Sequence, residues 1–413
     1  MERDIQILRA LAVQYMLLAY KAEEEHLWEL HADLNDLCPR RPIVLIHELP
    51  WHELNQDGSL TLQCQDPDYR KAEDYLRKTL FQQKYFPADM LVKAYLPVEK
   101  TIRTSGIGVE VKEETLAVDK ENQIVSHRYE NQFHSIEDVE KLHNPVIFYD
   151  REDSLRRFEK ISEAVADIVP VKLVGEDTGY GLGHKAWDII ASFMSVNDLL
   201  YALIDEPEMM HALVKKLTDI FLDTVRQYEE LNLLNPDSTY CHCSAAASRT
   251  LRNNLPADGQ VKARHVWGRG LAQILATVSP AMHEAFEIEH AKRAMEPFGL
   301  VYYGCCEPLD TKIDIVRKIP HLRKISITPW ADIHRAAETI GKNYVISAKP
   351  NPANLPYAAS NPELIRKEIR TILDACRKNG CPCELLLKDI STTGKNLENL
   401  IVWNRIAKEE IFS

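Results

Sequence analysis

Short apolar runs alternate with amphipathic stretches along most of this chain of 413 residues. Apolar runs that stop at prolines or polar residues are typical of buried strands. The sequence contains eight of them: PIVLIHELPW from Pro42, DMLVKAYLP from Asp89, PVKLVGEDT from Pro170, LAQILATVSP from Leu271, LVYYGCCEP from Leu300, LRKISITPW from Leu322, YVISAKPNP from Tyr344 and ELLLKDIST from Glu384. Helical stretches separate most of the runs, and parallel strands need such crossovers. The pattern therefore predicts an α/β fold, a (β/α)₈ TIM barrel.

Two further segments lie outside this alternation. Residues 4–37 carry apolar side chains at helical spacing, with charged residues between them, which predicts one long or two short amphipathic helices. We expect residues 1–38 to form an N-terminal helical cap on a barrel of residues 39–413. Residues 98–150 alternate in the manner of antiparallel strands, which predicts a β-hairpin inserted after the second barrel strand.

The composition narrows the classes of partner. With 50 basic and 62 acidic residues the net charge is −12, which argues against binding to nucleic acid or to an anionic membrane, because both need a positive field. The apolar stretch near the N-terminus is interrupted at Gln14, short of the roughly 20 residues of a membrane span. Nine cysteines, an odd number, argue against a disulfide scaffold. We expect a cytoplasmic protein that binds small molecules, with the oligomeric state open and a homodimer included.

In TIM barrels the catalytic groups lie at the carboxyl ends of the strands. The predicted strands of this chain end in reactive side chains, and we assign roles to them by type. We expect catalytic roles for Glu48, His52, His283 and Lys349. We expect contacts to the substrate from Trp51, Glu53, Glu176, Asp177 and Trp330. Lys349, and Lys388 with Asp389, could each form an ion pair that closes the barrel, and a substrate anchor is an equally good interpretation of Lys349.

The most unusual strand end is the run YGCCEPLD, residues 303–310. Two thiols and a carboxylate stand side by side in it, and all three are metal donors: Cys305, Cys306 and Glu307. Adjacent residues of a strand point to opposite faces, so one thiol at most enters the barrel mouth unless the strand ends at Gly304. Packing as small buried side chains is the alternative for both thiols.

A second group of metal donors is Cys241, His242 and Cys243. The spacing makes a compact chelate. However, the group belongs to a polar connection, residues 235–268, outside the eight predicted strands. For that reason we do not assign it a catalytic role.

The order of strand ends resembles that of the uroporphyrinogen decarboxylase superfamily, in particular a poorly characterised branch from anaerobic bacteria. The segments that carry the resemblance are SVNDLLYALIDEPEMMHALVKKLTD, SPAMHEAF, YYGCCEPLD and ISITPWAD. The resemblance covers most of residues 40–410, and it implies a (β/α)₈ barrel with one of two activities. The superfamily includes cofactor-free porphyrin decarboxylases and zinc-dependent methyltransferases that exchange methyl groups with corrinoid proteins or thiols.

The chain departs from the decarboxylase pattern. Those enzymes present arginines near the first strand and keep an aspartate after the second. Here LPWHE follows the first strand, and the second ends in YLP. A pocket lined by acidic groups such as Glu48 and Glu176 would also repel a polycarboxylate. Decarboxylation of uroporphyrinogen is therefore not expected.

The methyltransferase pattern is matched in part. That branch carries His-x-Cys at the end of the fifth strand and a second cysteine at the end of the eighth. In this sequence Tyr303 replaces the histidine, Cys305 matches the first cysteine, and Asp389 falls near the second. Cys306 and Glu307 follow at once. The resemblance thus implies a zinc site made of Cys305, Cys306, Glu307 and Asp389.

The resemblance favours a zinc-dependent methyltransferase that acts on a small methylated substrate, with a corrinoid protein or a thiol as methyl partner. Two alternatives stay open. One is a metal-independent decarboxylase of a small carboxylic acid, and the other is a non-catalytic barrel that serves as a binding subunit of a corrinoid complex. Zinc content of the purified protein separates the first hypothesis from the other two.

Overall fold

The computed structural model describes residues 2–116, 125–179 and 181–413. Its helices are α1 Glu2–Ala19, α2 Ala22–Asn35, α3 Trp51–Leu54, α4 Pro67–Tyr85, α5 Ile136–Glu140, α6 Arg151–Val165, α7 Ala186–Phe193, α8 Val196–Asp205, α9 Pro207–Glu230, α10 Arg249–Asn253, α11 Pro280–His283, α12 Glu289–Met295, α13 Ile313–Val316, α14 Ile333–Ile340, α15 Pro362–Asn379 and α16 Leu397–Ile411. Its strands are β1 Ile43–Ile46, β2 Leu96–Glu99, β3 Thr101–Thr104, β4 Glu113–Leu116, β5 Ser126–Tyr129, β6 Ile147–Asp150, β7 Val171–Val174, β8 Tyr240–Cys241, β9 Ser244–Ala245, β10 Trp267–Gly270, β11 Leu300–Tyr303, β12 Leu322–Ile327, β13 Val345–Ala348 and β14 Cys383–Leu387.

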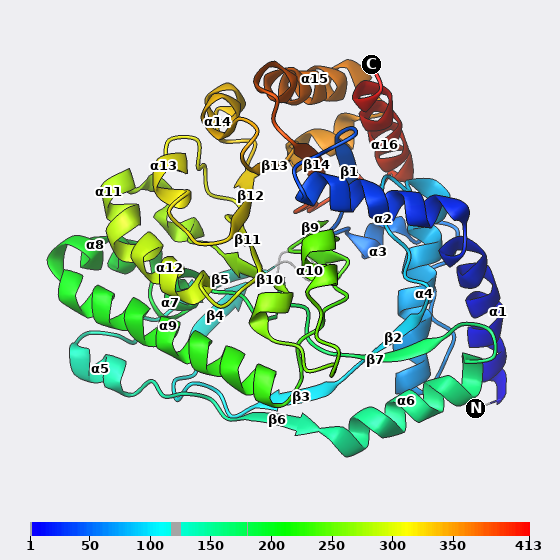
Figure 1. Cartoon of the computed structure of the whole chain (residues 1–413), viewed down its shortest axis with the longest axis horizontal. Coiled ribbons are helices and arrows are strands. Elements are labelled where there is room, and N and C mark those ends of the chain that lie inside the picture. The colour runs from blue at the N-terminus through cyan, green and yellow to red at the C-terminus, as the bar shows by residue number, and fades with distance from the viewer. Residues whose placement is uncertain (1, 117–124, 180) are drawn as a thin grey trace.

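Six parallel strands form the central sheet, in the order β1-β14-β13-β12-β11-β10. They run in an arc, with α14, α15 and α16 along its outer side (Figure 1). Strands β1, β11, β13 and β14 are buried along their whole lengths, as expected for parallel strands that are covered on both faces. The prediction of an α/β fold with parallel strands is confirmed.

The second and third predicted strands do not join this sheet. Among the described residues, β2 and β7 pair in parallel with each other alone. The outer edge of β1 is covered by Asp89, whose backbone N–H donates to the Val44 carbonyl and whose carboxylate accepts from the Val44 N–H, both at 2.8 Å. The second strand therefore begins at Leu96 and not at Asp89. A closed eight-stranded barrel stays a prediction.

The fourth predicted strand, LAQILATVSP, is wrong. The structure forms a 3₁₀ turn there, Gln273–Thr277, and the strand lies earlier, at β10. This strand reads WGRG. A side chain at Gly268 would place its Cβ 2.7 Å from the Phe298 ring, so close packing requires glycine at this position. The position of β10 therefore depends on close packing at a glycine and not on a run of apolar residues.

Replacing Asp89 by asparagine should reduce the acid sensitivity of the fold. Asp89 also accepts from Arg41, at 2.8 and 2.9 Å, and from Lys408. Burial raises the pKa of Asp89, but these two cations outweigh it and lower the pKa to about 2 from its ordinary value of 3.8. A lowered pKa stabilises the fold above the ordinary pKa, and the stabilisation is lost as the pH falls from about 4 towards 2.

We therefore expect the free energy of urea unfolding to fall between pH 7 and pH 3 by about 1 kcal/mol more in the wild type than in Asp89→Asn. An equal fall in both proteins would contradict this role of Asp89.

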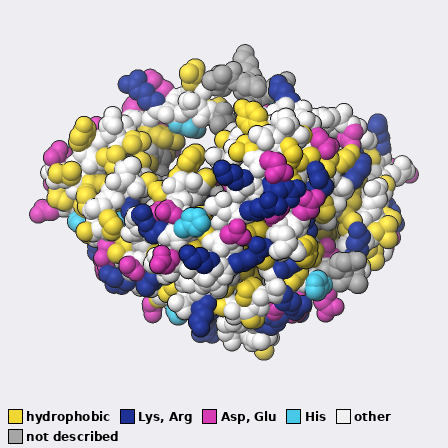
Figure 2. Space-filling model, turned by 90° about the horizontal axis from the view of Figure 1, so that it is seen from above, with side chains coloured by type: hydrophobic (Ala, Val, Ile, Leu, Met, Phe, Trp, Pro, Cys, Tyr) yellow, Lys and Arg dark blue, Asp and Glu magenta, His cyan; other side chains and the backbone are white. Residues whose placement is uncertain are grey.

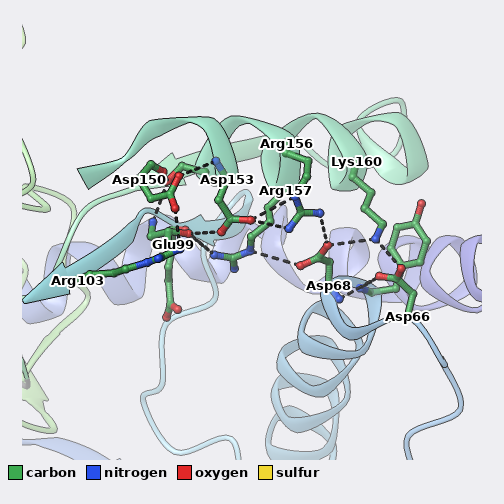
Figure 3. Close-up of polar contacts among 12 residues, drawn as sticks. Asp66, Asp68, Glu99, Arg103, Asp150, Asp153, Arg156, Arg157 and Lys160 are labelled. Carbon is green, nitrogen blue, oxygen red and sulfur yellow. Dashed lines mark hydrogen bonds and ion pairs between the residues drawn. The ribbon is translucent and has the colours of Figure 1, made fainter. Parts of the chain in front are cut away.

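The N-terminal helices and the insertion pack against several parts of the molecule, with α2 beside β1 and α5 beside α9. Residues 4–37 form α1 and α2, and α1 packs against α4 and α6. In the described part of the insertion, β3 pairs with β6 and β4 pairs with β5, both antiparallel. Arg156 and Lys160 of α6 contact Asp68 in the first turn of α4, at 2.8 and 3.1 Å (Figure 3). Partly exposed pairs of this kind contribute at most about 1 kcal/mol each.

A short segment of the long connection, residues 240–245, enters the concave side of the arc (Figure 1). Strands β8 and β9 pair there as a small antiparallel hairpin. Ser244 Oγ donates to Glu384 at 2.5 Å, and Lys324 Nζ donates to the Ala245 carbonyl at 2.9 Å. Lys324 and Glu384 themselves form a buried ion pair of 3.1 Å. This ion pair anchors the hairpin inside the sheet.

The surface carries mixed charge. On the face shown in Figure 2, basic side chains stand among acidic ones. Within the described ranges, no single helix has both the length and the apolar composition to cross a membrane, and α7 and α8 meet these two criteria only when taken together, with a bend of 110° between them.

Candidate metal centre

Three segments bring metal-binding side chains together at the carboxyl edge of the sheet. Glu48 follows β1, Cys305 follows β11, and His242 and Cys243 form the turn between β8 and β9. One donor atom from each of Glu48, His242 and Cys243 lies within 4.8 Å of the other two. His242 Nε2 lies 3.1 Å from Cys305 Sγ, and Cys243 Sγ lies 3.5 Å from Glu48 Oε1. An oxygen, a nitrogen and a sulfur therefore converge, and the second sulfur, that of Cys305, adjoins them at His242.

The backbone at this cluster adopts a conformation that side chains disfavour. Positive φ angles of 51°, 47°, 68° and 56° occur at Glu48, His242, Cys243 and Asp389. Each such residue costs roughly 1–2 kcal/mol relative to the right-handed conformation. Strain that gathers at one place in the fold points to a site retained for function rather than for stability.

The two adjacent thiols occupy different positions. Their Sγ atoms lie 3.5 Å apart, because the strand has already ended at Gly304, which has a φ of 99°. Cys305 is buried, whereas Cys306 is half-buried and donates to Asp389 at 3.4 Å. The hydrogen bond from Cys306 and the charge of Lys388 outweigh burial and lower the pKa of Cys305. Cys305 is therefore the thiolate of the pair.

Lys388 places a buried ammonium group among the donors. Its Nζ lies 3.1 Å from His242 Nε2, 3.4 Å from Glu48 Oε2 and 3.3 Å from Asp389 Oδ2, and the side chain is 2% exposed. Burial lowers the pKa of Lys388, but Cys305, Glu48 and Asp389 raise it above its usual value, so the amine is charged. The donors thus surround a position that favours positive charge.

The donor set fits zinc. Zinc takes sulfur at about 2.3 Å and nitrogen or oxygen at about 2.0–2.2 Å, in a tetrahedron whose edges are then about 3.3–3.8 Å long. The His242–Cys305 and Cys243–Glu48 separations of 3.1 and 3.5 Å are close to such edges. Burial lowers the pKa of His242, and a neutral imidazole is the form that binds metal. A metal ion would have to displace the ammonium group of Lys388 from His242 Nε2 in order to bind that nitrogen.

Both carboxylate oxygens of Glu307 accept from backbone amides. One of its oxygens accepts from the Cys305 N–H at 2.8 Å, and the other accepts from the Ala272 N–H at 3.1 Å. The residue is 1% exposed. That Glu307 binds zinc stays a prediction. Its position indicates that it supports the cysteine turn.

Replacing Glu307 by glutamine should leave bound zinc in place and lower stability. A glutamine amide nitrogen cannot accept, so one buried N–H would lose its partner, at a cost of about 1–3 kcal/mol. Elemental analysis and urea unfolding of the same preparation measure both quantities. Loss of zinc at unchanged stability would show instead that Glu307 is a ligand.

Cys306 and Asp389, the two other predicted ligands, lie at the exposed edge of the cluster. They contact each other, and Lys388 also holds Asp389. Lys349, predicted to be catalytic, lies beneath the cysteine turn. Its Nζ donates to Ser326 Oγ, and that hydroxyl donates to the Cys305 carbonyl at 2.7 Å.

Of the residues expected after the first strand, Glu48 alone reaches the cluster in the described part of the chain. Glu53 accepts instead from side chains and amides of residues 392–395, which ties α3 to the loop after β14. Trp51 packs on α4. His52 is exposed. The structure therefore does not bring these three side chains to the thiols.

His283 and Trp330 also lie away from the cluster. His283 is buried on α11, where its Nε2 lies 2.9 Å from the Tyr303 hydroxyl and its Nδ1 lies 3.3 Å from Lys312 Nζ. Burial, and then Lys312, lower the pKa of His283 to about 3, so it is not a base near neutral pH. Trp330 is 69% exposed. Their positions do not support the predicted roles.

Glu176 and Asp177 line a separate cleft of about 890 Å³ beside β2 and β7. Burial and the neighbouring Asp177 raise the pKa of Glu176. His47 and Tyr240 also line the cleft. His47 precedes Glu48 in the sequence, and Tyr240 begins the hairpin that carries His242. None of the four donor residues is among the residues that line it in the described structure. The two acids therefore face a different space from the thiols.

The sequence interpretation identified His242 and Cys243 as a possible chelate without giving them a role at the site. It identified Lys388 only as a possible ion-pair partner of Asp389, a pair that the structure contains at 3.3 Å. The compact Cys-His-Cys spacing was the available signal for the first two residues. A second signal lay in two charges, Lys324 and Glu384, within otherwise apolar strands. Buried charges of this kind need partners, and the hairpin that carries His242 supplies hydrogen bonds to both.

No family model matches this chain, and no curated protein matches it. A solved structure described as a methyltransferase from Methanosarcina mazei is similar in fold, with a TM-score of 0.50. The alignment covers 93% of this chain and 98% of that chain. The two sequences are 11% identical, so the likeness extends to the fold alone.

Proposed function

We propose that this chain is a zinc-dependent methyltransferase that acts on a small methylated substrate, with a corrinoid protein or a thiol as methyl partner. The observation that carries the proposal is the convergence of donor atoms from Glu48, His242 and Cys243, with Cys305 Sγ 3.1 Å from His242 Nε2. The fold shared with a solved methyltransferase and the resemblance of YGCCEPLD support it. We also propose that β2 and β7 complete a (β/α)₈ barrel that is open beside β1.

The four donors would hold the zinc ion. Bound zinc would lower the pKa of a thiol, or act as a Lewis acid on the heteroatom that carries the methyl group. Lys388 holds the second oxygen of Glu48, which fixes the orientation of that carboxylate. Asp389 accepts from Cys306 at the exposed edge.

The acceptor supplies the electron pair of the new bond, either as a thiolate or as cobalt(I), which is formally oxidised to cobalt(III) in that step, so no other oxidant is needed. The bond between the methyl carbon and its donor heteroatom breaks, a bond from that carbon to the acceptor forms, and a proton goes to the heteroatom. Burial of Cys305, His242 and Cys243 keeps water from the reacting atoms on one side, while Glu48 and Asp389 leave the other side open.

The test is methyl transfer by protein reconstituted with zinc. Short acids that carry a methoxy, methylthio or methylamino group serve as donors, and cob(I)alamin or a small thiol serves as acceptor. We expect the acceptor to be methylated with the wild type and not with Cys305→Ser. Release of CO₂ from these acids without methylation of either acceptor would contradict the proposal.

A second candidate function is a metal-independent lyase that acts on a small carboxylic acid. The ammonium group of Lys388 favours it, because that group contacts His242, Glu48 and Asp389 as a metal ion would. This candidate predicts trace zinc in the purified protein and activity that resists chelators. Metal content therefore separates the two candidates.

A further inference from the structure

In the described structure, two buried basic side chains beside the cysteine turn have no carboxylate partner. Arg269 is 7% exposed and Lys349 is 4% exposed. Among the described residues, neither has an acidic oxygen within 4.0 Å. A buried charge without a partner costs free energy, so buried basic groups of this kind usually pair with an anion.

The two cations point to the same place. Arg269 lies opposite Tyr302 in the pairing of β10 with β11, so both side chains leave the same face of the sheet. The Tyr302 hydroxyl accepts from Lys349 at 3.1 Å. The Tyr302 ring also lies 6.1 Å from the ring of His242, measured between centroids. Arg269 and Lys349 therefore flank the ring next to the proposed metal ligand.

Arg269 keeps one edge available. Its Nη1 donates to the Gly179 carbonyl at 2.9 Å, whereas its buried Nε has no hydrogen-bond partner in the described structure. Gly179 is close to His242, because a Cβ on that glycine would lie 2.5 Å from the His242 nitrogen. The Nε edge of a guanidinium group is one that pairs with both oxygens of a carboxylate.

The acidic groups nearby are already engaged. Glu48 and Asp389 contact Lys388, Glu307 accepts from two backbone amides, and Glu384 pairs with Lys324. None of these carboxylates is within ion-pair distance of the two cations. Asp188, which also feels the charge of Arg269, accepts from Gln273. Among the described residues no carboxylate is paired with the two cations, so a ligand can supply one.

We propose that Arg269 and Lys349 form a subsite for the carboxylate of a small organic acid, and that this subsite sets the acid's reactive carbon beside Cys305. The part that concerns a methyl-bearing acid rests on the proposed function. The carboxylate subsite itself does not. The substrate class is then a short carboxylic acid with a methylated heteroatom.

The test compares alkylation of Cys305 by iodoacetate and by iodoacetamide, in full-length protein treated with a chelator. In both reactions the thiolate sulfur displaces iodide, a sulfur–carbon bond forms and the carbon–iodine bond breaks. Both reagents use the same thiolate, so the ratio of their rates does not depend on the pKa of Cys305. Cys38 is exposed and serves as the internal reference. Peptide mass spectrometry reports the rate at each cysteine.

We expect the iodoacetate-to-iodoacetamide ratio to be at least about tenfold higher at Cys305 than at Cys38, which corresponds to about 1.4 kcal/mol. Arg269→Gln should lose most of this preference. Arg269→Lys should keep part of it, because lysine retains the positive charge but lacks the paired N–H donors of the guanidinium group. Arg264→Gln removes an exposed arginine five residues earlier and should leave the ratio unchanged. Circular dichroism confirms that the variants are folded.

Equal ratios at Cys305 and Cys38 would overturn the subsite, and so would an unchanged preference in folded Arg269→Gln. A Cys305 that neither reagent reaches would also overturn it, because a subsite for a small acid must admit one. Protein that prefers iodoacetate but never holds zinc would overturn the proposed function and leave the subsite standing. The two claims can thus fail separately.

Discussion

Purified His242→Ala protein should contain less than about a tenth of the zinc bound by the wild type. His242 is the donor closest to Cys305, at 3.1 Å, and it sits on a strained turn held in place by buried contacts. Changing residues that merely support metal ligands costs about 10- to 100-fold in affinity, so loss of a ligand should cost at least the upper value. Zinc is measured by elemental analysis after dialysis against a weak chelator.

The two cysteines provide a matched pair for this prediction. Cys305→Ser should lose zinc as His242→Ala does, whereas Cys306→Ser should keep most of it, because Cys306 faces Asp389. His334→Ala removes an exposed histidine and is the control for general effects. The thermal midpoint should change little in all four variants, since the core does not depend on the metal. Equal retention of zinc in Cys305→Ser and Cys306→Ser would contradict the ligand assignment.

Replacing Lys324 by methionine should have the largest effect on stability. The Lys324–Glu384 pair is buried, and removing one partner leaves a charge without compensation, at a cost of about 3–5 kcal/mol. Lys324 also donates to Ser244 and to the Ala245 carbonyl, so the variant should hold zinc more weakly as well. Urea unfolding and zinc titration measure the two effects.

Two control variants test whether burial of the ion pair causes the loss of stability. The pair between Lys71 and Glu99 has the same 3.1 Å separation but is exposed, so Lys71→Met should cost less than about 1 kcal/mol. The double variant Lys324→Met with Glu384→Leu should recover much of the loss, because no charge is left buried alone. If Lys324→Met and Lys71→Met cost the same, the buried pair does not anchor the hairpin.

The sequence predicts the parallel strands well where they are buried on both faces. The runs LVYY and VISA and the last strand CELLL are apolar enough to be found, and their order gives the α/β class. The sequence pattern misses the strand WGRG because Gly268 is required by close packing against Phe298. No local pattern reveals that contact. The predicted second strand begins too early in the sequence because Asp89 forms ion pairs with Arg41 and Lys408 instead of starting a strand.

The candidate site is predicted in part for a related reason. Glu48 and Cys305 follow strands directly, so the rule about strand ends finds them. His242 and Cys243 reach the site through a hairpin anchored by Glu384, which lies about 140 residues later in the chain. The rule places Glu307 at the mouth as well, but it does not reveal that both oxygens of this side chain accept from backbone amides.

X-ray absorption at the zinc edge of the purified protein tests the central claim most directly. Coordination by Glu48, His242, Cys243 and Cys305 predicts one zinc per chain with two sulfurs at about 2.3 Å and two nitrogen or oxygen atoms at about 2.0–2.2 Å. In Cys305→Ser the sulfur count should fall to one in whatever zinc remains. Zinc coordinated without sulfur, or protein that holds no more than trace zinc, would contradict the account.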